Sequence, residues 1–203
     1  GDITRYAGDA IALAASKNAD SLDEILGLIH VEYEELEPLR NPAESLAEDA
    51  PLIHESGNIL SREKLVRGDA EKAIESAAFK VTKTYSTPFT EHAFMEPECA
   101  VAVCENDGIL LYTGSQGIYD DQREVAQLLG LEKEKVRVKA MLVGGGFGGK
   151  EDMSVQHHAA LLAWVLKKPV KVKFSRQESI LIHPKRHAME MELTTACDET
   201  GKL

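Results

Sequence analysis

A run of glycines carries the strongest chemical signal in this sequence. Residues 144–150 read GGGFGGK, and they stand between an expected strand and an expected helix. Five glycines in six residues lose much conformational entropy on folding, so the segment must need positive φ angles or a close approach of bare backbone to a ligand. Backbone amides beside a helix N-terminus favour an anion or an electronegative oxygen. The pattern predicts a ligand-binding loop, with a tight structural turn as the simpler alternative.

The same segment also matches the G-x-x-x-x-G-K pattern of nucleotide-binding phosphate loops. That pattern requires Ser or Thr after the lysine to hold magnesium, whereas Glu151 and Asp152 follow Lys150. Two carboxylates would repel a polyphosphate instead of supplying a hydroxyl ligand. A degenerate phosphate-loop module therefore remains as a second interpretation of the loop.

The elements around the loop must bring it to the edge of a sheet. The expected elements are strand 79–87, strands 99–104 and 109–113 around an Asn106-Asp107-Gly108 turn, helix 120–129 capped by Gly130, strand 135–143, helix 152–166, strand 170–174 and strand 189–196. Strands that alternate with helices in this order predict an α/β fold.

The first part of the chain has a different pattern. Residues 10–37 predict a strand, a helix and a second strand, with Ser21 and Glu24 at the spacing of a capping box. Residues 38–68 contain several prolines and glycines with little periodicity, so they predict a linker. The last residues, from Asp198 to Leu203, suggest that the chain is a fragment of a longer protein.

Charge and composition exclude several function classes. The net charge is −11, and residues 1–80 hold 17 acidic against 8 basic side chains, so a nucleic acid is not expected as a partner. No apolar run approaches the roughly 18 residues of a spanning helix, and no membrane contact is expected. Three cysteines do not form a disulfide framework, which favours the cytoplasm.

Other residues that could bind a metal have simpler explanations. The adjacent His157 and His158 lie about 100° apart on a helix and cannot hold one ion together, so they are expected to be core or interface residues. His183 and His187 are separated by a sequence with Pro184, which argues against a regular helix and a shared metal. Packed thiols are the expectation for the cysteines at 99 and 104.

Taken together, the motifs resemble the molybdenum hydroxylases, the family of xanthine dehydrogenase and aldehyde oxidase, and most closely xanthine dehydrogenase. The resemblance rests on the glycine loop, TGSQ at 113–116, EHAFMEP at 91–97, VEYEEL at 31–36 and YAGDA at 6–10. It implies the end of a hammerhead α/β domain over residues 1–37, a linker over 38–68, and the first part of a molybdopterin-binding domain over 69–203.

The resemblance also implies roles for particular residues. Gln116 occupies the place of a glutamine that donates a hydrogen bond to the oxo group of the molybdenum. Backbone amides near Gly145, Gly146, Phe147 and Gly148 would approach the cofactor, which places Gln116 and Phe147 next to the metal. Glu151 matches the glutamate with which purine-oxidising members bind the heterocycle; the simpler explanation is a first-turn helix glutamate favoured by the macrodipole.

The implied reaction is hydroxylation of a purine such as xanthine, or of another N-heterocycle, with water as the oxygen source. In the family, electrons pass to iron–sulfur clusters and FAD in other domains or subunits, so the full-length protein is expected to be an oligomer. The general base and a substrate-orienting arginine lie beyond Leu203, so no catalytic residue is expected here. The 203 residues alone are expected neither to bind the cofactor tightly nor to turn over, and a non-catalytic interaction fragment is a further alternative.

Overall fold

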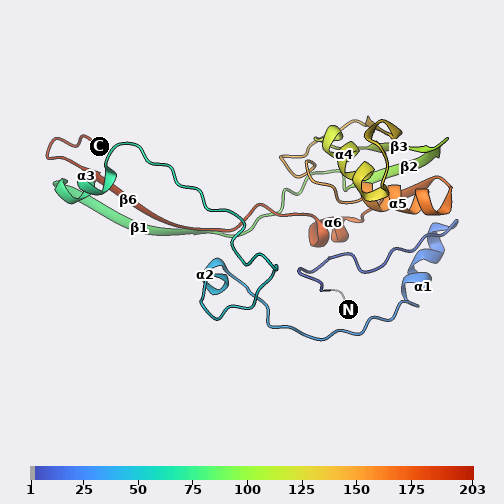
Figure 1. Cartoon of the computed structure of the whole chain (residues 1–203), viewed down its shortest axis with the longest axis horizontal. Helices are drawn as coiled ribbons and strands as arrows, with labels where there is room; N and C mark the ends of the chain where they lie inside the picture. The colour runs from blue at the N-terminus through green and yellow to red at the C-terminus, as the bar shows by residue number, and fades with distance from the viewer. Residues whose placement is uncertain (1–2) are drawn as a thin grey trace. The chain divides into compact units, whose positions relative to one another are not determined.

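The computed structural model describes residues 3–203, which divide into two units. One unit comprises residues 3–31 and 90–186, and the other comprises residues 32–89 and 187–203. Each unit has its own sheet, and each is described by itself (Figure 1).

The first unit contains a four-stranded mixed sheet with the strand order β4-β3-β2-β5. Strands β2 (Cys99–Glu105) and β3 (Gly108–Thr113) form the antiparallel hairpin that the sequence predicts, with Asn106 at a positive φ of 54° in the turn. A side chain at Gly108 would collide with the carbonyl oxygen of Lys135, so the end of the turn requires glycine. Strand β5 (Val170–Lys173) pairs with the free edge of β2.

A parallel crossover completes this sheet. Helix α4 (Ile118–Leu129) connects β3 to β4 (Val136–Ala140) through the short 3-10 helix η2 (Lys133–Lys135). The predicted cap is confirmed, because Gly130 adopts a left-handed conformation with a φ of 64°. β4 is shorter than the predicted strand 135–143, since residues 141–143 leave the sheet.

The core of the first unit lies between this sheet and helices α4 and α5 (Gln156–Leu166), which pack against each other and against the strands. Its buried apolar residues come from the hairpin, both helices and the flanking segments: Ala100, Ala102, Ile109, Leu111, Val125, Ala126, Val136, Val155, Ala159, Ala160, Ala163 and Phe174. A mixed α/β fold, as predicted, therefore supports the loops at the strand ends.

The N-terminal segment differs from its prediction. Instead of strand, helix and strand, residues 10–37 form the 3-10 helix η1 (Ala19–Ser21) and the one-turn helix α1 (Leu22–Leu26), and no strand. The predicted capping box is also wrong, because Ser21 is already helical and the side chain of Asn18 caps η1 instead. A strand needs a partner for its backbone hydrogen bonds, and the alternating pattern of residues 30–36 finds none in the described chain.

A capping box does form where the sequence analysis missed a helix. Ser175 and Glu178 cap helix α6 (Arg176–Ile182) reciprocally through side chain and backbone. The helix ends at His183, directly before Pro184, as expected for a residue that precedes proline.

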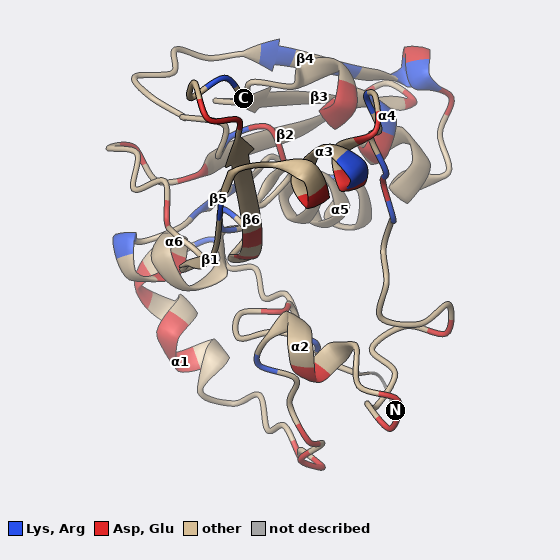
Figure 2. Ribbon diagram, turned by 90° about the vertical axis from the view of Figure 1, so that its left-hand side faces the viewer, with Lys and Arg blue, Asp and Glu red and all other residues tan. Residues whose placement is uncertain are grey.

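The second unit is built on a two-stranded antiparallel ribbon. Strands β1 (Phe79–Thr87) and β6 (Met189–Cys197) pair along all nine residues, and both agree closely with their predicted ranges. Two short helices, α2 (Pro42–Ser45) and α3 (Ala70–Ser76), interrupt otherwise irregular chain. Acidic side chains appear on both α1 and α2 (Figure 2). Among residues 32–89 and 187–203 none is buried.

Candidate cofactor-binding site

Two predicted motifs meet because their strands are parallel neighbours. β3 and β4 pair in register from Ile109 with Val136 to Thr113 with Ala140, so both strands end at the same edge of the sheet. The first residue after β4, Met141, donates its N–H to the carbonyl oxygen of Thr113 over 2.9 Å. The segment 114–117 after β3 and the glycine loop after β4 therefore start side by side.

Gln116 and Lys150 hold these two segments together. The backbone N–H of Gln116 donates to the carbonyl of Lys150 over 2.7 Å, and the N–H of Lys150 donates to Oε1 of Gln116 over 3.2 Å. The Ser115 hydroxyl adds a hydrogen bond to the same Lys150 carbonyl over 3.4 Å. Because Oε1 of Gln116 is occupied, its exposed Nε2 is left with two free N–H donors among the described residues.

The close approach explains the glycine at position 146. A Cβ there would overlap Oε1 of Gln116 and would lie 2.8 Å from its Cδ, which is closer than side-chain atoms tolerate. The structure therefore brings Gln116 into direct contact with a loop whose last residue, Lys150, is 34 positions away in the chain.

The tip of the loop has a strained backbone. Phe147 adopts a positive φ of 56° and Gly148 follows at 85°, while the N–H of Gly149 closes the turn onto the carbonyl of Gly146 over 2.7 Å. A left-handed conformation is costly for an aromatic residue and concentrates at ligand sites. The Phe147 side chain is 76% exposed. Within the described chain no hydrogen bond uses the N–H groups of Phe147 and Gly148, so these donors remain available.

Lys150 points away from the loop surface. Its residue is only 6% exposed, and Nζ lies 3.6 Å from Oε2 of Glu96 and 4.5 Å from the centre of the Phe94 ring. In a phosphate loop the lysine must reach the ligand. The buried ammonium of Lys150 removes the cation on which the phosphate-loop interpretation depends.

Glu151 lies on the loop and not in a helix. Helix α5 begins at Gln156, four residues later than the predicted start at Asp152, because the Gln156 side chain accepts the N–H groups of Ser154 and Val155 and closes the helix end. The carboxylates of Glu151 and Asp152 are exposed. The simpler explanation of Glu151 as a first-turn helix residue is therefore wrong.

The adjacent histidines on α5 and the cysteines behave largely as expected. The rings of His157 and His158 lie 3.9 Å apart, and burial, with a smaller contribution from His158, lowers the pKa of His157 to about 4. Cys104 donates its thiol to the carbonyl of Ala163 over 3.1 Å, and all three cysteines are free.

Sequence analysis missed two buried polar groups near the site. Asp121 is fully buried on α4, and burial raises its pKa to about 6. Glu91, His92 and His183 form a cluster beneath the loop. No spacing in the sequence could reveal the cluster, because about 90 residues separate His183 from Glu91 and His92.

Comparison with known proteins identifies the fold family. A family described as the molybdopterin cofactor-binding domain matches residues 53–203. The chain belongs to this family. The resemblance to the molybdenum hydroxylase family that the sequence motifs indicated is thereby confirmed.

Two curated relatives align over the whole chain. It is 42% identical to the nicotinate dehydrogenase large molybdopterin subunit of Eubacterium barkeri, and 39% identical to a Bacillus subtilis protein named as a probable subunit of xanthine dehydrogenase. The chain spans 48% and 27% of the length of these two relatives, respectively.

Solved structures of similar proteins have the same fold as this chain. Quinoline 2-oxidoreductase from Pseudomonas putida matches with a TM-score of 0.82 and 26% identity over 90% of this chain and 24% of its own. Aldehyde oxidoreductase from Desulfovibrio gigas has the same fold, with a TM-score of 0.84 and 24% identity over 91% of this chain and 21% of its own. Among residues 3–203 no helix is long and apolar enough to cross a membrane.

Proposed function

We propose that this chain supplies one wall of the molybdenum-cofactor site in a hydroxylase that oxidises an N-heterocycle, such as a purine like xanthine. The observation that carries the proposal is the contact of Gln116 with the glycine loop. It ties up the side-chain oxygen and leaves the side-chain N–H groups exposed beside the free amides of the loop.

The residues present fit a cofactor that carries oxygen and sulfur acceptors. The Nε2 group of Gln116 and the backbone N–H groups of Phe147 and Gly148 are neutral donors, which hydrogen-bond an electron-rich ligand without adding charge. Glycines at 145 and 146 keep the loop backbone bare toward such a ligand. When bound, the molybdenum cofactor supplies two-electron oxidation of an electron-poor carbon, with water as the oxygen source.

Phe147 would act by position. Its exposed ring stands on the strained tip of the loop, next to the amide donors. An apolar ring at this place would exclude water from the ligand and strengthen the hydrogen bonds of its neighbours. In the proposal Gln116 and Phe147 are the residues nearest the metal.

Glu151 is the proposed substrate-binding residue. Its carboxylate is exposed at the end of the loop, and it has no hydrogen-bond partner within residues 3–203. A carboxylate accepts ring N–H groups, which oxidised purines carry and aldehydes lack. Two similar proteins are named for xanthine and for nicotinate, which are both N-heterocycles, and of the two only xanthine carries ring N–H groups.

The proposal assigns the remaining steps to other parts of the holoenzyme. Electrons would leave through iron–sulfur and FAD groups in partner domains or subunits, and several similar proteins are named as subunits. The general base would also lie outside these residues. We further propose the division into hammerhead residues 1–37, linker 38–68 and molybdopterin-binding residues 69–203.

The test uses the complete holoenzyme that contains this chain, with an artificial electron acceptor and xanthine or nicotinate as substrate. Glu151→Gln is expected to lower kcat/KM for the preferred heterocycle about tenfold to hundredfold, the loss typical of a hydrogen bond to a charged group. Glu134→Gln, an exposed glutamate on η2, serves as the matched control. Gln116→Leu is expected to lower kcat with little change in KM.

Two results would overturn the proposal. Wild-type holoenzyme that carries molybdenum but oxidises no N-heterocycle would remove the substrate class. Equal kinetics of the Glu151 and Glu134 variants would remove the role of Glu151. Calorimetric binding of ATP with magnesium would favour the phosphate-loop alternative instead.

A further inference from the structure

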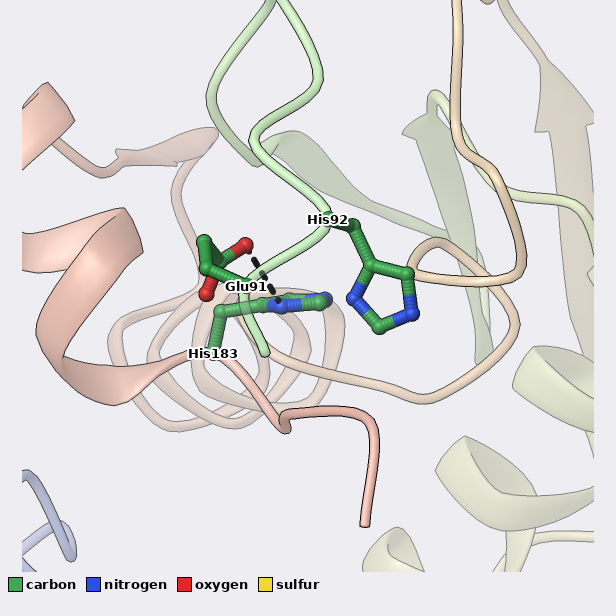
Figure 3. Close-up of side chains that lie close together, drawn as sticks. All are labelled: Glu91, His92 and His183. Carbon is green, nitrogen blue, oxygen red and sulfur yellow. Dashed lines mark ion pairs between the residues drawn. The ribbon is translucent and has the colours of Figure 1, made fainter. Parts of the chain in front are cut away.

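Four side chains that can bind metals converge beneath the glycine loop of the first unit. Glu91 and His92 come from the segment before β2, Glu98 directly precedes β2, and His183 follows α6. One ligand atom each from Glu91, His92 and His183 lie within 4.8 Å of one another, and Figure 3 shows the three side chains together. The rings of His92 and His183 meet edge to face with their centres 5.3 Å apart.

His183 and Glu98 are buried, Glu91 and His92 are half-buried, and several polar atoms of these side chains lack partners. The side chains of His183 and Glu98 are 1% and 5% exposed. Nδ1 of His92, Nδ1 of His183 and both carboxylate oxygens of Glu98 have no hydrogen bond within residues 3–203. Buried polar atoms are nearly always satisfied in native proteins, and a bound ion is one physical reason for an exception.

The orientation of His183 identifies where an ion would sit. Its Nε2 faces the carbonyl oxygen of Gly149, which only accepts, so Nε2 carries the proton and donates it. Nδ1 then holds a lone pair, and it lies 3.4 Å from Oε1 of Glu91. A lone pair and a carboxylate oxygen repel each other unless a proton or a metal cation lies between them. Zinc bonds of about 2.0–2.2 Å in a tetrahedron place two ligand atoms at about this separation.

The outer contacts match those of known metal sites. A metal-binding histidine typically donates its other ring N–H to a backbone carbonyl, as His183 does to Gly149. Ligating carboxylates are also hydrogen-bonded in turn, and Oε2 of Glu91 lies 2.6 Å from Nζ of Lys185. Oε1 of Glu91 also accepts the backbone N–H of Ala93 over 3.2 Å.

The charges nearby also favour a divalent cation. Lys185 balances one of the two carboxylates, Glu91 and Glu98, and Lys150 is paired with Glu96 instead. Glu98 lines a small cavity together with Gly149 and Lys150, and its Oε1 lies 3.9 Å from Nε2 of His183.

We propose that Glu91, His92 and His183 bind one zinc-class divalent ion, with water completing a four-coordinate shell. The ion would join two separate segments directly behind the glycine loop. Gly149 contacts the cluster so closely that a Cβ would lie 2.8 Å from His92 and 2.9 Å from His183. The site would therefore fix the end of the loop from which Lys150 and Glu151 follow.

The experiment measures metal content apart from activity. Complete protein containing this chain is purified without chelator, and zinc and molybdenum are quantified separately by mass spectrometry. About one zinc per chain is expected in the wild type and in His157→Gln, a histidine on α5 outside the cluster. The variants His92→Gln and Glu91→Gln are expected to lose at least tenfold in zinc affinity.

Cobalt provides the second measurement. After dialysis against EDTA, addition of Co²⁺ alone is expected to give the visible absorption of a four-coordinate site in the wild type and not in Glu91→Gln. If His92→Gln does not fold, Glu91→Gln still tests the site, because it is close to isosteric. Its circular dichroism spectrum shows whether this variant is folded. Wild-type protein that takes up neither zinc nor cobalt, or variants that bind as well as the wild type, would overturn the proposal. If His183 and Glu91 share a proton instead of a metal ion, the wild type is expected to take up neither zinc nor cobalt.

Discussion

The four-stranded sheet of the first unit and the β1–β6 ribbon of the second were equally visible as strand patterns, yet they differ in burial. Leu111, at the centre of the sheet, is fully buried, whereas Val81 in the ribbon is 57% exposed. Helices α4 and α5 pack against the sheet, whereas the ribbon consists of two strands and has only the short helix α3 in contact with β6 among the described residues. An alternating pattern therefore predicts a strand, but what covers its apolar face depends on other elements.

The two regions differ in electrostatics as well. The buried carboxylate of Asp121, the half-buried His157 and the Glu91 cluster all lie in the first unit, whereas the second unit exposes its charged groups. Buried groups change their pKa because the charged form loses water. pH-dependent stability should therefore arise mainly in the first unit.

The largest expected effect comes from opening a cavity in the sheet. Leu111→Ala should lower the free energy of unfolding by about 2–5 kcal/mol, because the side chain is fully buried between neighbouring strands and helices. Val81→Ala, the matched change in the ribbon, should stay within about 0.5 kcal/mol. Urea unfolding followed by circular dichroism measures both, and similar losses would contradict the contrast between the units.

Two buried titrating groups should have opposite effects. Asp121 has its pKa raised by burial, mainly, and by the charges of Glu124 and Asp120, so the folded state loses stability as pH rises from about 4 to 6. At pH 7 the free energy of unfolding of Asp121→Asn should exceed that of the wild type by up to about 3 kcal/mol. This difference should vanish near pH 4.

His157 gives the opposite slope. Its lowered pKa means that the unfolded chain binds the proton first, so stability is present above about pH 6.5 and is lost as pH falls toward 4. As pH falls from about 6.5 to about 4, the free energy of unfolding of His157→Gln should rise by about 3 kcal/mol relative to that of the wild type. Unfolding free energies at half-unit pH steps test both variants, and parallel pH profiles for wild type and variants would show that neither group titrates as described.

The smallest effect separates two glycines of the loop. Gly149→Ala should cost about 1–3 kcal/mol, because the new Cβ would meet ring atoms of His92, His183 and Phe94 at 2.8–2.9 Å. Gly145→Ala should change stability by less than about 0.5 kcal/mol, since its nearest neighbour at 3.3 Å is the exposed ring of Phe147, which can turn away. Thermal unfolding of the two variants tests this difference. Equal midpoints would show that the loop can shift to accommodate a Cβ at Gly149.

Local signals predicted much of the sheet unit. The Asn106 turn, the Gly130 cap and the strands of the hairpin form as expected, because turn and cap residues act within a few positions. Predictions were wrong for two different reasons. The pattern of residues 30–36 found no partner strand in the described chain, which is a matter of tertiary structure. Helix α5 begins late for a local reason, because the Gln156 side chain accepts the preceding N–H groups of Ser154 and Val155.

The sequence by itself determined the glycine loop, the position of Gln116 after a strand and the family to which these motifs belong, because each is encoded within a short stretch. Only the tertiary structure decided that β3 and β4 run parallel, which brings Gln116 to the loop, and that Lys150 turns inward. It alone assembled Glu91, His92 and His183. The physical reason is that contacts between distant segments depend on packing and pairing, which a local pattern of residues does not specify.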